Sequence, residues 1–226
     1  RADEADTGAR ADLAQAAFAH QSLGAGFREA VGEHSRHLDP EAAALLERWW
    51  NEEPETFSVV RDRDGTVAGF LSVFEGHQLK GSIVGGDPIL EAWARDLAVN
   101  PLPKGQVALG LRRWLDADAG EGPCATQAAA WLDVKRTYME LRSSLRRLYT
   151  VSSELEAYAD SLGALRFQVL PEAEVRLGAA TYHTAMLDFG HDSVVGWLAR
   201  LAEVDDVADD DHVPEPAIPD ESAVGS

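Results

Sequence analysis

The sequence predicts an α/β (α+β) domain in which helices flank a central sheet. Two patterns carry this prediction: helical and β-rich stretches alternate over most of the chain, and one pair of β-rich stretches has the signature of a hairpin. With 226 residues, 45% of them hydrophobic, the chain suits one domain around one core. We expect this domain to span residues 1–203, with a helical lead-in over residues 1–50.

The lead-in ends with the clearest helix start in the chain. Two stretches, 11–20 and 27–37, have helical patterns. Asp39 and Pro40 then precede the sequence EAAALLERWW, and an aspartate cap followed by proline at the first helical position is typical of a helix N-terminus. A helix is therefore predicted from Pro40 onward.

A β-hairpin is predicted over residues 55–74. Two β-rich runs meet there at Asp64 and Gly65, a pair that tolerates positive φ angles in tight turns. A glycine-rich connection follows. The elements expected after it are a helix over 89–99 closed by Pro101 and Pro103, a strand over 106–115, a helix over 127–142, a strand over 146–152, a helix over 153–163, strands over 165–171 and 181–189, and a last helix over 193–203.

The strongest functional pattern lies in the middle of the chain. The strand over 106–115 is followed by a turn of mostly small residues over 116–126 and then by a helix start. The first backbone N–H groups of a helix have no partner within the helix and carry partial positive charge. A phosphate or a developing oxyanion can bind at such a place, so the sequence predicts an anion site here.

The order of elements and this turn-to-helix unit resemble the GNAT superfamily of acyl-CoA-dependent N-acyltransferases over roughly residues 42–189. The resemblance implies a mixed, mostly antiparallel central sheet and acetyl-CoA or another acyl-CoA as cofactor. In the superfamily, an Arg/Gln-x-x-Gly-x-Gly/Ala loop after the fourth strand holds the pyrophosphate with its amides. On this chain, the cofactor-binding residues implied are Arg112, Arg113, Gly122, Cys124, Ala125, Thr126 and Gln127.

The loop of this chain departs from the superfamily motif. It contains glycines, but neither the Arg/Gln of the motif nor its glycine spacing. Pro123 lacks a backbone donor, and the carboxylate of Glu121 would repel a phosphate. The pyrophosphate loop is therefore degenerate.

The candidate general acid is displaced as well. Superfamily members that protonate the departing thiolate carry a tyrosine four residues before the glycine of a Leu-Gly-Phe sequence. Here Ala159 has that place relative to Gly163, and Tyr158 lies one residue earlier, about 100° around a helix. Tyr158 is the candidate acid, in a position where it can equally face the core.

Carboxylates and one cysteine in the turn are the other candidate catalytic groups. Asp116, Asp118 and Glu121 are the nearest candidates for a general base, and each can equally be an ordinary loop charge. Cys124 lies just before a helix, where a thiol pKa can be lowered. A small residue that fits a tight turn is the other interpretation of Cys124.

Charge is distributed unevenly. The formal net charge is −19, and residues 203–221 contain nine acidic side chains and no Lys or Arg. Such a segment cannot offset the entropy lost on ordering, so residues 204–226 are predicted to be a disordered acidic tail or linker. Between Lys104 and Arg147, eight basic residues outnumber five acidic ones. This island either attracts a small polyanion or consists of solvated charges.

Composition argues against several classes of protein. The acidic balance opposes nucleic-acid binding. No apolar run is long enough to cross a bilayer and no signal-peptide pattern opens the chain, so a cytoplasmic protein without membrane contact is expected. One cysteine cannot form an internal disulfide, and no Cys/His spacing indicates a metal site.

Two functions follow from the sequence. The first is a non-catalytic GNAT-like module that senses a ligand or regulates a larger protein. Arg1 in place of an initiating Met and the acidic tail suit neighbouring domains or a protein partner, and a homodimer is also open. The second is an active N-acetyltransferase that moves an acetyl group from acetyl-CoA to an amine. The degenerate loop and displaced tyrosine favour the first; an open cleft between the central strands would favour the second.

Overall fold

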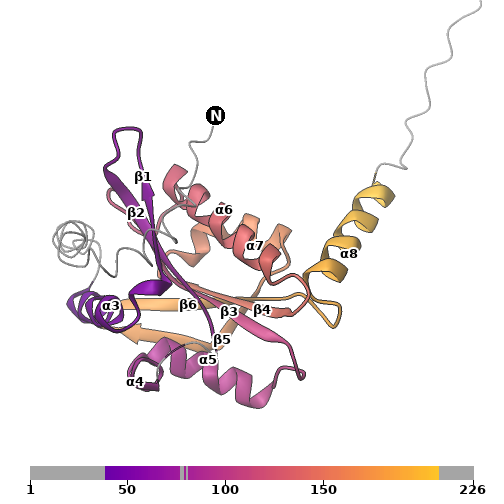
Figure 1. Ribbon diagram of the computed structural model, residues 1–226, viewed down its shortest axis with the longest axis horizontal. Helices are drawn as coiled ribbons and strands as arrows, with labels where there is room; N and C mark the ends of the chain where they lie inside the picture. The colour runs from indigo at the N-terminus through magenta and orange to yellow at the C-terminus, as the bar shows by residue number, and fades with distance from the viewer. Residues whose placement is uncertain (1–38, 77–78, 80, 209–226) are drawn as a thin grey trace, which may run out of the picture.

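The computed structural model describes residues 39–76, residue 79 and residues 81–208 of the chain (Figure 1). The predicted helices over 11–20 and 27–37 lie outside these residues, as does the predicted acidic tail after residue 208. The described residues form a six-stranded sheet with helices packed against both faces.

Six strands build the central sheet. They are β1 (Phe57–Arg61), β2 (Val67–Glu75), β3 (Val107–Asp116), β4 (Leu145–Ser152), β5 (Gln168–Leu177) and β6 (Ala180–Asp188). Their order is β1-β2-β3-β4-β6-β5. The central strands β3 and β4 run parallel, and every other neighbouring pair is antiparallel. The predicted mixed, mostly antiparallel sheet flanked by helices is confirmed.

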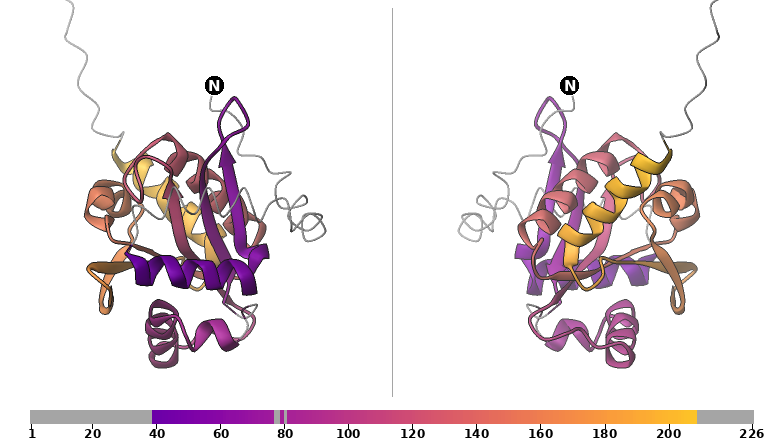
Figure 2. Two further views of the ribbon diagram at one scale, coloured as in Figure 1. Left: turned by 90° about the vertical axis from the view of Figure 1, so that its left-hand side faces the viewer. Right: turned by 90° about the vertical axis from the view of Figure 1, so that its right-hand side faces the viewer.

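Helices cover each face with a separate apolar core. They are α3 (Pro40–Glu52), α4 (Gly81–Val84), α5 (Pro88–Val99), α6 (Ala125–Glu140), α7 (Ala159–Ala164) and α8 (Ser193–Ala208), with 3-10 turns η2 (Pro54–Thr56) and η3 (Leu155–Tyr158). Trp49 of α3 and Trp93 of α5 pack on one face. Val134 of α6 and Trp197 of α8 pack on the other, and the right-hand view of Figure 2 shows these two helices on the same side.

Asp39 fixes the start of α3, as predicted. Its Oδ1 accepts a hydrogen bond from the backbone N–H of Glu41 at 2.9 Å, and Pro40 is the first helical residue. Its Oδ2 accepts from the N–H of Ala179 at 3.0 Å, while the Glu41 carboxylate accepts from the N–H of Gly178 at 2.9 Å. The helix therefore begins against the turn between β5 and β6.

Residues with positive φ angles explain the turn of the predicted hairpin and the end of the helical segment before β5. The predicted hairpin is confirmed, with Gly65 at a φ of 81° between β1 and β2. The single helix predicted over 153–163 is wrong, because the chain forms the separate elements η3 and α7. Arg166 then has a φ of 62°, which ends α7 and delays β5 to Gln168.

Two elements extend beyond their predicted ends. β5 continues through Pro171 to Leu177. A proline has no N–H to donate, but β5 is an edge strand and its pairing with β6 shifts register between Leu170 and Val175, so Pro171 is tolerated there. α8 continues to Ala208, past the predicted start of the tail at residue 204. The glycine-rich connection contains the short helix α4.

The central strands β3 and β4 separate towards their carboxyl ends. Their pairing runs from Val107 and Leu145 to Leu111 and Thr150, although β3 continues to Asp116 and β4 to Ser152. A register shift in the β2–β3 pairing lies at the same level, where successive pairs join Ser72 to Arg113 and Val73 to Leu111. Such a bulge bends a strand, and here it accompanies the opening of a gap between β3 and β4.

Candidate functional site

The turn after β3 closes tightly and directs Glu121 into the sheet. Oδ1 of Asp116 accepts from the backbone N–H groups of Asp118 and Ala119 at 2.8 and 2.7 Å. Gly120, at a φ of 62°, accepts from the N–H of Asp116 at 2.8 Å. Asp116 therefore organises the turn that precedes Glu121.

Glu121 lies in the gap between β3 and β4. Its Oε1 accepts from a guanidinium nitrogen of Arg113, and its Oε2 accepts from the hydroxyls of Ser152 and Ser153 at 3.0 and 2.9 Å and from the N–H of Ser153 at 2.7 Å. The exposed fraction is 5% for Glu121 and 2% for Arg113. One buried carboxylate thus joins the end of β3 to the end of β4.

The surroundings of Arg113 favour its charged form. Burial acts to lower its pKa, but the Glu121 carboxylate and Tyr182 outweigh burial, and the pKa is raised. The guanidinium carbon also lies 4.7 Å from the centroid of the Tyr182 ring. The carboxylate of Glu121 therefore meets a permanent positive charge in a buried place.

Arg112 is held by a second buried carboxylate. Its Nε and Nη2 donate to Asp87 at 2.6 and 3.2 Å, and the indole N–H of Trp49 donates to the same carboxylate at 2.9 Å. Burial acts to raise the pKa of Asp87, but the charge of Arg112 and the hydrogen bonds outweigh it, and the pKa is lowered. Sequence reasoning missed Asp87, although its place before Pro88 indicates the N-cap of α5.

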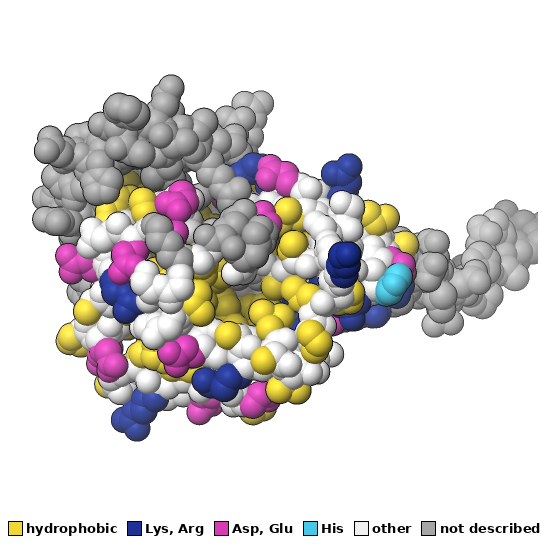
Figure 3. Space-filling view, turned by 60° about the horizontal axis from the view of Figure 1, so that its bottom comes forward, with side chains coloured by type: hydrophobic (Ala, Val, Ile, Leu, Met, Phe, Trp, Pro, Cys, Tyr) yellow, Lys and Arg dark blue, Asp and Glu magenta, His cyan; other side chains and the backbone are white. Residues whose placement is uncertain are grey.

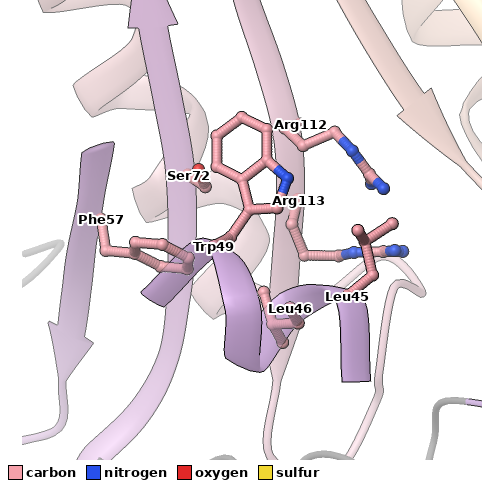
Figure 4. A pocket seen from close by; sticks show the side chains of 7 residues that line it. All are labelled: Leu45, Leu46, Trp49, Phe57, Ser72, Arg112 and Arg113. Atoms are coloured by element: carbon pink, nitrogen blue, oxygen red, sulfur yellow. The ribbon is translucent and has the colours of Figure 1, made fainter. Parts of the chain in front are cut away.

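Both arginines line a small pocket on the α3 side of the sheet. Its cavity volume is only about 10 Å³, and Figure 4 shows the two guanidinium groups extending to the same side, alongside Trp49 and Leu45. The prediction that Arg112 and Arg113 assist a pyrophosphate remains untested, and in this structure each guanidinium contacts a carboxylate.

A larger pocket lies between α6 and the η3–α7 segment. Its cavity volume is about 280 Å³. We call it the aromatic pocket. Its lining residues are Trp114, Pro123, Cys124, Gln127, Ala128, Trp131, Ala157, Tyr158, Ser161, Leu162 and Leu165. None of them carries a charge at neutral pH.

Tyr158 closes one wall of the aromatic pocket. Its ring stacks on Trp114 with centroids 5.0 Å apart, and its hydroxyl donates to the backbone oxygen of Glu121 at 2.7 Å. Burial, followed by the nearby Cys124 and Glu121, raises the pKa of Tyr158. The hydroxyl therefore keeps its proton at neutral pH, and its role as general acid stays a prediction.

Cys124 is the N-cap of α6 and lines the same pocket. Burial raises the pKa of its thiol, and the negative charge of Asp116 acts in the same direction, while the amides of Gln127 and Thr126 oppose them. The thiol is therefore protonated at neutral pH, which does not suit a nucleophile.

The other residues predicted to bind cofactor surround the start of α6. Gln127 is buried, and its side-chain N–H donates to Gly120 at 2.9 Å. Thr126 packs over β2, where a Cβ at Gly69 would lie 2.5 Å from its methyl group. Ala125 is exposed and Gly122 half-buried. Sequence reasoning missed Ser152 and Ser153 at the gap and Leu162 and Leu165 in the pocket, because only the fold brings them there.

The opposite face carries an apolar pocket between α4, α5 and the sheet. Phe74, Leu90, Trp93 and Tyr149 contribute to its lining, and its cavity volume is about 80 Å³. Figure 3 shows apolar side chains around a hollow on this side of the molecule. Within the described ranges, no helix is long and apolar enough to cross a membrane, and no three His, Cys, Asp or Glu side chains gather in a way that could hold a metal ion.

Comparisons with known proteins find likeness in structure alone. No family model and no curated protein matches the sequence. The NatC complex bound to Gag peptide and CoA is 10% identical, covering 73% of this chain and 89% of that chain, with a TM-score of 0.44. FeeM, an N-acyl amino acid synthase from uncultured soil microbes, is 13% identical, covering 79% and 92%, with a TM-score of 0.47. A Drosophila melanogaster polyamine N-acetyltransferase is 13% identical, covering 66% and 82%, with a TM-score of 0.41.

These likenesses support no conclusion about the family of this chain. At such identities, and with TM-scores below 0.5, they say nothing about what this chain binds or catalyses. The strand order and the separating parallel pair are properties of the chain itself.

Proposed function

We propose that this chain is a GNAT-like domain that does not transfer acyl groups and serves instead as a ligand-sensing or regulatory module, with neighbouring domains or a protein partner. The observation that carries the proposal is the position of Glu121. Its carboxylate lies where β3 and β4 separate and accepts hydrogen bonds from Arg113, Ser152 and Ser153. The resemblance to acyltransferases leads us to expect an open cleft between the central strands if the chain is an enzyme.

Opening the gap for a cofactor is energetically costly. Glu121 and Arg113 are both almost fully buried, so separating them leaves two charges without partners. Breaking a buried ion pair costs about 3–5 kcal/mol. That cost corresponds to a loss of affinity of roughly a hundredfold to a few thousandfold for any ligand that must displace Glu121.

The candidate catalytic groups already have structural roles. The Tyr158 hydroxyl donates to a backbone oxygen of the loop, and the Asp116 carboxylate holds the turn. Glu121 is tied to both central strands. A general base must reach the proton of an amine, and in this arrangement these carboxylates are engaged elsewhere.

Titration calorimetry with acetyl-CoA and with CoA tests the proposal. We expect no heat of binding and no thermal shift with millimolar ligand. Saturable binding together with acetyl transfer to a panel of simple amines would overturn the proposal, most clearly if replacement of the turn over 121–126 abolished the transfer.

One observation favours the alternative, an active N-acetyltransferase. The Tyr158 hydroxyl, still protonated, and the N-cap of α6 at Cys124 lie on the same pocket, so an acid and a helix start are brought together. A Tyr158→Phe variant distinguishes the two functions. Loss of acetyl transfer with unchanged acetyl-CoA binding would support the enzyme; absence of transfer in the unaltered protein supports the sensing module.

A further inference from the structure

We propose that the aromatic pocket binds an uncharged organic molecule with an aromatic or other apolar body. This inference rests on the proposed function, because it supplies the ligand class that the sensing module would recognise. The observations are an uncharged lining, three aromatic side chains and a cavity that can hold a small ring system.

The size and lining of the aromatic pocket suit a small molecule. Its cavity volume of about 280 Å³ is close to the lower limit of about 300 Å³ that is typical of ligand pockets. Trp114 meets both Trp131 and Tyr158, with ring centroids 6.0 and 5.0 Å apart. Leu162 and Leu165 of the η3–α7 side also line the pocket. An apolar or aryl group in this space would gain dispersion contacts on two sides.

The absence of charge in the lining selects against a nucleotide diphosphate. No Lys, Arg or His is among the lining residues, and the buried Arg113 is already paired with Glu121. The turn beside the pocket carries negative charge at Asp116, whose pKa is lowered: burial acts to raise it, and hydrogen bonds from Ala119, Thr126 and Asp118 outweigh burial. A phosphate in the pocket would lose its hydration without gaining a counter-charge.

Fluorescence titration with N-phenylnaphthylamine, an uncharged apolar probe, tests the pocket. We expect saturable binding to the full chain. Ala128→Trp on α6 and Ser161→Trp on α7 each place a bulky ring in the pocket and should weaken binding at least tenfold. Leu132→Trp is the matched control, because Leu132 is an exposed α6 residue that does not line the pocket. Unfolding midpoints identify the variants that fold.

Competition by ethylbiphenyl and biphenylacetate tests the preference for an uncharged ligand. The two molecules have similar apolar bodies, but biphenylacetate is charged at neutral pH, and we expect it to bind at least tenfold more weakly because the lining offers no counter-charge. No saturable probe binding, unchanged binding to both pocket-filling variants, or equal binding of the two competitors overturns the inference. Acetyl-CoA titration reports separately on the proposed function, because probe binding is measured whether or not acetyl-CoA binds.

Discussion

Glu121 and Arg113 form a buried ion pair across the gap between the separating strands β3 and β4. The serines at the end of β4 complete the coordination of the carboxylate. The pair therefore links the two halves of the sheet at the level where their backbone pairing has stopped. The contribution of this pair to the free energy of unfolding can be measured by mutation.

Replacing Glu121 by Gln should destabilise the protein strongly. The amide keeps the shape of the side chain but leaves Arg113 charged and buried without a counter-ion, which costs about 3–5 kcal/mol. Urea unfolding at neutral pH measures the change in the free energy of unfolding. Glu156→Gln, at an exposed position, is the control and should stay within about 0.5 kcal/mol. A loss below about 1 kcal/mol for Glu121→Gln would contradict the role given to the pair.

Replacing Gly69 by Ala should also destabilise the protein, by about 1–3 kcal/mol. The new Cβ would lie 2.4 Å from the backbone oxygen of Leu115 and 2.5 Å from the Thr126 methyl group, so the start of α6 would have to move. Gly81→Ala is the control, because no atom lies within 4 Å of a Cβ there. Thermal unfolding of both variants tests this prediction. Equal unfolding midpoints for the two variants would contradict it, because they would mean that α6 can move without loss of stability.

Asp87 should make stability depend on acid pH. Its pKa is lowered below the ordinary value of 3.8, so its contribution is fully present above that pH and is lost as the pH falls through the lowered pKa. Asp87→Asn should cost about 3–5 kcal/mol at neutral pH, because Arg112 stays buried without its partner. The loss should shrink as the pH falls below 3.8. Urea titrations at several pH values test this, and a loss that does not change with pH would disprove the linkage.

The thiol of Cys124 should react slowly with iodoacetamide at neutral pH. Its pKa is raised by burial, and the charge of Asp116 raises it further, so little thiolate is present. Asp116→Asn should speed alkylation, since one of the two causes is removed. Mass spectrometry of the alkylated protein gives both rates, with urea-unfolded protein as the reference. A rate faster than that of the unfolded chain would contradict the raised pKa.

Local signals in the sequence were enough to predict most elements, whereas the site depends on contacts between distant residues. Asp39 caps α3 and Gly65 turns the hairpin, and each signal lies within a few residues of its effect. The order of strands and helices followed from such signals. The pairing of Arg112 with Asp87 depends instead on α5 packing across the sheet, which no periodicity specifies.

That Glu121 repels a phosphate stays a prediction, and the sequence did not indicate that Arg113 is its partner. Arg113 is only eight residues away in sequence, yet the contact requires β3 to bulge and to separate from β4. Trp114 and Tyr158 likewise meet only because the η3–α7 segment folds back beside α6. The aromatic pocket was therefore outside the reach of sequence reasoning.

The early end of the β3–β4 pairing has a mechanical consequence. The sheet consists of two antiparallel three-stranded units, β1-β2-β3 and β4-β6-β5, whose backbones are joined by five residue pairs. A force that pulls the two units apart would act on the backbone hydrogen bonds of these pairs and on the hydrogen bonds of the Glu121 carboxylate at the same time. We therefore expect the domain to separate first between β3 and β4 under tension. When the Glu121 side chain is removed, amide hydrogen exchange should increase first in these two strands.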